Sequence, residues 1–86
     1  VEPILVKSFD LNSVVDVQEI SNELRDGNIV ILNISPLMDE DPEELKRAID
    51  QLKSVASEIG GDVGRLSESR IITTPELVKI EFRREE

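Results

Sequence analysis

Few residue types in this 86-residue chain could do chemistry, because histidine and cysteine are both absent. Their absence removes imidazole bases, thiol nucleophiles, disulfides and the usual soft metal ligands. The serines and threonines would need a neighbouring base to act as nucleophiles, and the spacing of the carboxylates and lysines singles out none of them. We therefore predict no catalytic residue, no metal site and no cofactor, and expect that the protein is not an enzyme.

The densest group of carboxylates is the segment 39–44 (DEDPEE), which has five acids in six residues. A hard cation could bind such a group, but the segment lacks the glycine and the distant glutamate of a calcium loop. Acidic residues are also favoured at the N-terminus of a helix, where the helix dipole is positive. We interpret the segment as the start of a helix.

The glycine-rich segment 60–64 (GGDVG) has the composition of a phosphate-binding loop. However, it follows a predicted helix, and no lysine or helix start comes after it. Its glycines instead suit the end of a helix and a tight turn into a strand, and Gly64 indicates a bulge or a close backbone approach.

Two arginines, Arg65 and Arg70, are cations on strand-like segments close to Ile71 and Thr73. They could bind an acidic and apolar peptide, or they could pair with neighbouring acids as solvated surface charges. The net charge of −9 gives no electrostatic basis for binding nucleic acid and disfavours an anionic membrane surface.

The hydrophobic pattern predicts an α/β fold with the order β-α-β-α-β-β-β and one domain over residues 1–86. In the first helix Ser13 and Asp16 resemble a capping box, and Gly27 provides a left-handed stop. The first two strands should be parallel, because one helix connects them. The expected strands are 4–6, 28–34, 62–67, 70–74 and 77–83, and the expected helices lie between Ser13 and Gly27 and between Leu45 and Ile59.

The central strand has apolar residues at both parities, which is typical of a strand covered on two faces. Two helices on one face of a five-stranded mixed sheet leave the other face bare. Either Ile29 and Ile31, or Val30, Leu32 and Ile34, must lie on it. A second copy packed on this face would bury the apolar patch, and ~800 Å² from each partner is a normal interface.

Four segments in order make the chain resemble the SepF family of cell division proteins. They are 18–27 (QEISNELRDG), 29–33 (IVILN), 60–66 (GGDVGRL) and 71–75 (IITTP). The resemblance spans nearly the whole chain. The acidic segment 35–44 and Thr73 depart from the bacterial pattern and favour an archaeal type.

The resemblance implies an adaptor without catalysis. Such a protein dimerises through its sheet, binds the C-terminal tail of FtsZ and links FtsZ filaments to the membrane. It also implies a tail-binding site near the third and fourth strands, at Arg65, Arg70, Ile71 and Thr73. For the dimer interface we predict the residues Ile31, Gly61, Val63 and Ile72.

Members of the family begin with an amphipathic membrane-binding helix and a linker, and neither is recognisable in this chain. We therefore expect a fragment of a cytoplasmic protein that is peripheral at the inner face of the cell membrane at the division site. Two alternatives stay open. One is a homodimeric regulatory domain that binds a small metabolite, and the other is a carboxylate-based hydrolase, which would need a buried acid in a cleft.

Overall fold

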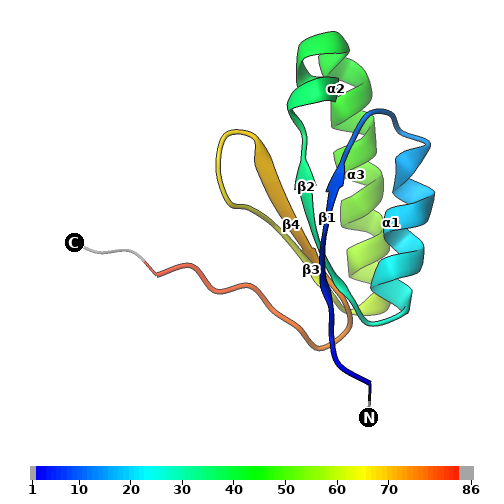
Figure 1. Cartoon of the computed structure of the whole chain (residues 1–86), viewed down its shortest axis with the longest axis vertical. Helices are drawn as coiled ribbons and strands as arrows, with labels where there is room; N and C mark the ends of the chain where they lie inside the picture. Colours follow the sequence, from blue (N-terminus) through cyan, green and yellow to red (C-terminus); the bar gives the residue numbers. More distant parts are fainter. Residues whose placement is uncertain (1, 84–86) are drawn as a thin grey trace.

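The computed structural model describes residues 2–83, which form four strands and three helices around one sheet. Figure 1 shows α1 and α3 together on one side of the sheet and α2 at its end. The elements in chain order are β1 (Val6–Asp10), α1 (Asp16–Arg25), β2 (Ile29–Asn33), α2 (Ser35–Glu40), α3 (Pro42–Ile59), β3 (Asp62–Arg65) and β4 (Arg70–Thr74).

The strand order is β1-β2-β4-β3, so β2 and β4 are central and β1 and β3 are the edges. β1 and β2 are parallel, as the single connecting helix predicts, and the other two pairs are antiparallel. The prediction of a mixed sheet is confirmed. The first strand begins at Val6 and not at Ile4, because the first residue pair of the ladder is Val6 with Ile29; Leu5 contributes only its carbonyl, which accepts from the N–H of Ile29 at 2.8 Å.

The prediction of a fifth strand over residues 77–83 is wrong, since the described part of the chain has four. Pro75 lacks a ladder N–H, and the N–H of Val78 donates to the Pro75 carbonyl at 3.2 Å in a turn. Leu77 takes a φ of 68° in that turn, which directs the chain away from β4. The segment then leaves the sheet on the side opposite the helices (Figure 1).

The start of α1 keeps only one half of the predicted capping box, because the helix begins at Asp16 after Val15 and not after Ser13. The Asp16 carboxylate accepts hydrogen bonds from the backbone N–H groups of Asn12 and Ser13, at 2.9 and 3.1 Å. The Ser13 hydroxyl accepts from the N–H of Val15 at 3.2 Å. Gly27 follows the helix with a φ of 91°, so the left-handed stop is confirmed.

The acidic segment 39–44 spans the boundary between two helices. α2 was not predicted, because Pro36 indicated only the end of a strand, but proline is also well suited to the first turn of a helix. At the start of α3 the Asp41 carboxylate accepts from the N–H of Glu44 at 3.1 Å. The interpretation of this segment as a helix start is therefore confirmed.

The hydrophobic core lies between the sheet and the two long helices. Val30 and Leu32 of β2 and Ile71 of β4 face the helices and are buried against Leu24 of α1 and Leu52 of α3. The sequence left open which alternating side chains of β2 lie on the bare face of the sheet, and the structure buries Val30 and Leu32 under the helices. It places Ile29 and Ile31 on the other face, where both are half-buried.

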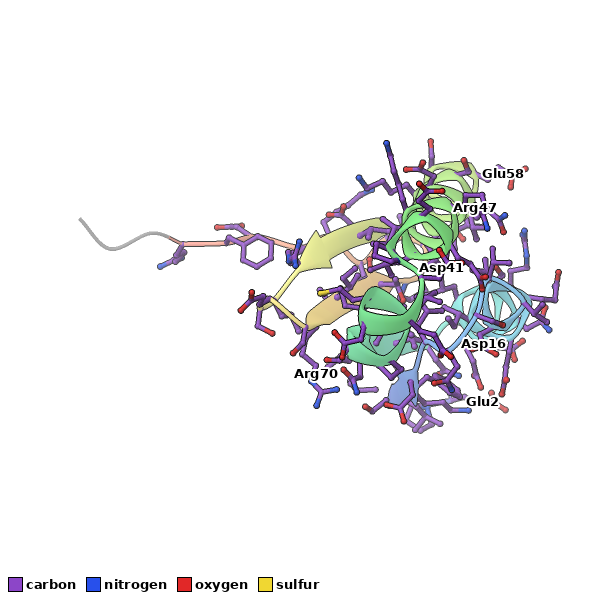
Figure 2. All side chains as sticks on the ribbon, turned by 90° about the horizontal axis from the view of Figure 1, so that it is seen from above. Glu2, Asp16, Asp41, Arg47, Glu58 and Arg70 are labelled. Carbon is purple, nitrogen blue, oxygen red and sulfur yellow. The ribbon has the colours of Figure 1, made fainter. Side chains whose placement is uncertain are left out.

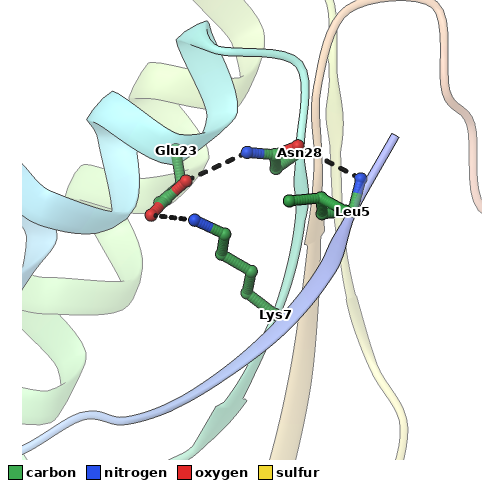
Figure 3. A network of polar contacts seen from close by, with 4 residues as sticks. All are labelled: Leu5, Lys7, Glu23 and Asn28. Atoms are coloured by element: carbon green, nitrogen blue, oxygen red, sulfur yellow. Dashed lines mark hydrogen bonds and ion pairs between the residues drawn. The ribbon is translucent and has the colours of Figure 1, made fainter. Parts of the chain in front are cut away.

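A polar cluster attaches the edge strand β1 to α1 (Figure 3). Lys7 Nζ donates to Glu23 at 2.9 Å, and the Asn28 side chain donates to the other Glu23 oxygen at 3.0 Å. Asn28 Oδ1 accepts from the N–H of Leu5 at 3.1 Å. The hydrogen bonds from Lys7 and Asn28 hold the pKa of Glu23 below its ordinary value of 4.5.

We expect Glu23→Gln to lower stability at neutral pH and to flatten its dependence on acid. Because the pKa of Glu23 is lowered on folding, its stabilising effect is complete above 4.5 and is lost as the pH falls through the lower folded-state pKa. Urea unfolding followed by circular dichroism across this range measures both effects. Glu40→Gln, at an exposed acid, is the matched control. Equal acid sensitivity of the two variants would contradict this role for Glu23.

We expect Gly61→Ala to destabilise the fold by about 1–3 kcal/mol, the usual cost of inserting a methyl group into packed structure. A Cβ on Gly61 would lie 2.0 Å from the backbone carbonyl oxygen of Thr74, so β3 and β4 would have to separate locally. Urea denaturation measures the loss against Ser57→Ala, which changes an exposed residue of α3. Equal stability of these variants would show that the backbone adapts without cost.

Candidate functional site

The sheet face opposite the helices, called here the open face, is the first candidate interaction surface. It is formed by the side chains that alternate with the core residues of each strand. Asp10, Asn33 and Arg70 are paired with one another at one end of the sheet, and the apolar members lie in the middle and toward the other end. Its apolar members are Val6, Ile29, Ile31 and Ile72.

Exposure differs along the open face. Val6 is 63% exposed, whereas Ile31 and Ile72 are half-buried and stand opposite each other on β2 and β4. At the β3 edge Gly64 pairs with Ile72, and the space above Gly64 is filled by Ile80 and Phe82. Neither the bulge nor the close backbone approach predicted at Gly64 is present: the strand register is regular, and the close neighbours are side chains of the C-terminal segment.

The four residues predicted for the dimer interface do not share one surface. Ile31 and Ile72 meet on the open face. Val63 is opposite Thr73 on the helix-covered side and packs against the core. Gly61 lies directly against the backbone of Thr74, which leaves no room for a side chain there. Only the first pair is therefore placed to contact a second copy across the open face.

A second candidate surface is a groove of about 340 Å³ between α3 and the edge strand β3. Ile49, Val63 and Ile71 supply apolar side chains to it, and Lys53 and Arg65 supply cations. Leu66 N–H donates to the Arg70 carbonyl, so antiparallel alternation turns the backbone groups of Val63 and Arg65 toward the outer edge of β3. The Val63 N–H already donates to the Asp62 carboxylate, so this edge offers the N–H and C=O of Arg65 and the C=O of Val63. Apolar residues, two cations and a free strand edge suit an extended acidic peptide.

The four residues predicted to bind a peptide are divided between surfaces. Arg65 lines the groove and donates to the carbonyl oxygens of Ser67 and Glu68, at 3.0 and 2.6 Å. Ile71 lines the groove from the core. Thr73 is fully buried and donates to the Val30 carbonyl at 3.0 Å. Arg70 is on the open face, and Figure 2 shows its side chain directed away from the helices.

Within residues 2–83, neither Arg65 nor Arg70 lies within 4 Å of a carboxylate. The sequence interpretation missed Lys53 and Ile49 of α3. These two residues are four apart, which is the spacing of neighbours on one helix face. That spacing was recognisable, but which strand the face would meet depends on the sheet order.

Asp62 connects the β3 edge to the C-terminal segment. One carboxylate oxygen accepts from the N–H of Ile80 at 3.0 Å, and the other accepts from the N–H of Val63 at 2.9 Å. The hydrogen bond from Ile80 is the main cause of the lowered pKa of Asp62, with smaller effects from Val63 and Lys79. The ionised carboxylate thus fixes the start of this segment at neutral pH.

A shallow groove of about 630 Å³ separates α1 from α3, and polar side chains such as Gln18, Asp50 and Gln51 make up much of its lining. No cluster of three acidic residues that could hold a metal ion occurs among the described residues. No described helix combines the length and the apolar character needed to cross a bilayer.

Comparison with known proteins identifies the family. The model described as "Cell division protein SepF" matches residues 6–80. The chain belongs to the SepF family. The curated SepF of Haloferax volcanii is 34% identical over 65 residues, which are 76% of this chain and 54% of that protein. The chain thus spans about half the length of this SepF relative.

Solved SepF-like structures share the fold. The SepF-like protein from Archaeoglobus fulgidus matches 96% of this chain and 99% of its own, with a TM-score of 0.88 and 28% identity. The SepF-like protein from Pyrococcus furiosus matches 94% and 100%, with a TM-score of 0.83 and 36% identity. SepF from Methanobrevibacter smithii, in complex with FtsZ-CTD, matches 92% and 99%, with a TM-score of 0.78 and 25% identity. SepF is a family of cell division proteins and is not known as an enzyme family.

Proposed function

We propose that this chain is a non-enzymatic cell division adaptor. It forms a homodimer, each copy binds the C-terminal tail of FtsZ, and the dimer links FtsZ filaments to the membrane at the division site. The observation that carries the proposal is the match over nearly the whole chain to a SepF solved in complex with FtsZ-CTD. The membrane contact belongs to a segment outside these residues, on the inner, cytoplasmic side.

The open face supports the dimer. Val6, Ile29, Ile31 and Ile72 expose apolar surface on the one side of the sheet that no helix covers. A twofold dimer pairs such a face with itself and so buries it without creating a further open surface. Two copies then present two tail-binding sites, and a filament presents many tails. Individually weak contacts become a firm attachment through the high effective concentration of the second site.

The groove between α3 and β3 supports the tail-binding site. Its apolar floor and its cations Lys53 and Arg65 offer the contacts that an acidic and apolar peptide needs. The groove thus presents two positive charges on a chain whose net charge is −9. The free edge of β3 adds backbone donors and acceptors, which give affinity to a bound strand. Of the residues first predicted for this role, Arg65 and Ile71 belong to the groove, and Arg70 offers a separate cation on the open face.

We expect Ile31→Asp to weaken the dimer at least about tenfold, equivalent to ~1.4 kcal/mol, because it places a charge in the centre of an apolar interface. The monomer should keep its fold, since Ile31 faces away from the core. Sedimentation velocity across a concentration series measures the dissociation constant, and circular dichroism measures the fold. Val15→Asp, at an apolar residue that is 77% exposed near α1, is the control. A variant that stays as dimeric as this control would place the interface elsewhere.

We expect Lys53→Glu to weaken binding of a fluorescently labelled FtsZ C-terminal peptide by about tenfold, which is ~1.4 kcal/mol. The control Arg47→Glu makes the same charge change on α3 outside the groove and should have a much smaller effect. Fluorescence anisotropy of the labelled peptide measures the dissociation constant for both variants. The label on the peptide is needed because the chain has no tyrosine or tryptophan.

Arg70→Glu completes the peptide-binding test. If it weakens binding and Lys53→Glu does not, the peptide lies on the open face and not in the groove. If the dimer binds no peptide at all, the adaptor proposal is wrong.

A further inference from the structure

We propose that residues 77–83, called here the arm, pack their apolar side chains onto the open face of a second copy. The inference rests on the proposed dimer and specifies how two copies hold each other. It assigns a role to the one segment whose hydrophobic pattern finds no place in the sheet of its own chain.

The arm has the residue pattern of a strand without being one. Val78, Ile80 and Phe82 alternate with charged residues, which is the pattern of a strand with one apolar face. Among the described residues these three belong to no strand, and Phe82 is 59% exposed. Apolar side chains along one face of a segment stabilise a structure only when another surface buries that face.

The first half of the arm is fixed to its own chain. The Thr74 hydroxyl donates to the Val78 carbonyl at 2.6 Å, and the N–H of Ile80 donates to Asp62. Lys79 Nζ donates to the carbonyls of Gly60 and Gly61, at 3.2 and 3.1 Å. These contacts set the direction in which the arm leaves the sheet.

That direction places the arm in front of the open face. A Cβ on Gly64, which would point to the open face, would meet Ile80 at 3.1 Å and the ring of Phe82 at 3.2 Å. Residues 77–83 run outward on the side of the sheet without helices (Figure 1). A second copy packed on the open face therefore meets the arm, and the apolar residues that it presents there are Val6, Ile29, Ile31 and Ile72.

Leu77 adds exposed apolar surface at the start of the arm. Its φ of 68° belongs to a turn that is held within the chain by hydrogen bonds from the N–H of Leu77 to the Gly60 carbonyl and from the N–H of Val78 to the Pro75 carbonyl. Its side chain is 87% exposed, so a second copy would find an apolar group there.

Charge also favours a second copy as the occupant. The arm carries Lys79, Glu81 and Arg83, a net charge of +1, while the chain as a whole has a net charge of −9. Placing the one excess positive charge of the arm on an acidic partner slightly reduces the repulsion between two copies. The groove proposed for the FtsZ tail lies between α3 and β3, on the other side of the sheet, so both can be occupied together.

The test is chemical cross-linking between cysteines introduced by mutation. The chain has no cysteine of its own, so each cross-link identifies one pair of introduced positions. One preparation carries Arg83→Cys on the arm. A second, with a different affinity tag, carries Ser8→Cys or Val6→Cys on the open face of β1. The two are mixed, allowed to exchange subunits and treated with a short bismaleimide, and products with both tags are counted. Ser57→Cys, exposed on α3, is the control.

We expect arm-to-face products between differently tagged copies and few products with the Ser57→Cys control. A mixture that sediments as dimers but gives no product with either β1 thiol would overturn the arm while leaving the proposed dimer intact. A mixture that sediments as monomers would overturn both.

A second measurement tests the energetic role of the arm. Phe82→Ser keeps all the hydrogen bonds that fix the arm and removes a ring that is 59% exposed and touches its own chain at Gly64, so the fold should be kept, as circular dichroism can check. We expect the dimer dissociation constant to rise at least about fivefold, as for removal of a large apolar contact from an interface. An unchanged or lower constant would mean that the arm covers its own sheet and does not contact a partner.

Discussion

The whole structure depends on the burial of one face of a four-stranded sheet under two helices. Val30 and Leu32 of the central strand β2 are fully buried on that side, and Leu52 of α3 is packed against them. Once these residues face inward, the strict alternation of a strand sends Ile29 and Ile31 to the other side. The uncovered apolar face is therefore a necessary consequence of the core, and the surfaces discussed above follow from it.

Local features of the fold could be predicted from the sequence, because the residues that cause them are neighbours in the chain. Ser13 with Asp16, Gly27, and the acids before α3 each act within one helical turn. The parallel pairing of β1 and β2 also followed from one connecting helix. Which set of alternating β2 side chains faces the helices could not be predicted, since both sets are apolar. The choice is made only when the helices pack on one face of the assembled sheet.

The predictions that failed needed long-range information. The alternating segment 77–83 has the pattern of a strand, but a pattern does not specify which edge or which copy it will meet. Thr73 and Val63 were assigned to surfaces, whereas the pairing of β3 with β4 turns both toward the helices. Lys53 and Ile49 were missed because α3 and β3 meet only in the folded chain. The family resemblance, by contrast, was carried by short segments and is confirmed by the match over residues 6–80.

The strand order has a mechanical consequence. β1 and the groove beside β3 lie at opposite edges of the sheet, with β2 and β4 between them. Tension applied between the start of β1 and a ligand in that groove crosses the three strand pairs of the sheet, with the core under α1 and α3 beside them as a second path. The sheet and the core together can thus bear load from one edge of the domain to the other.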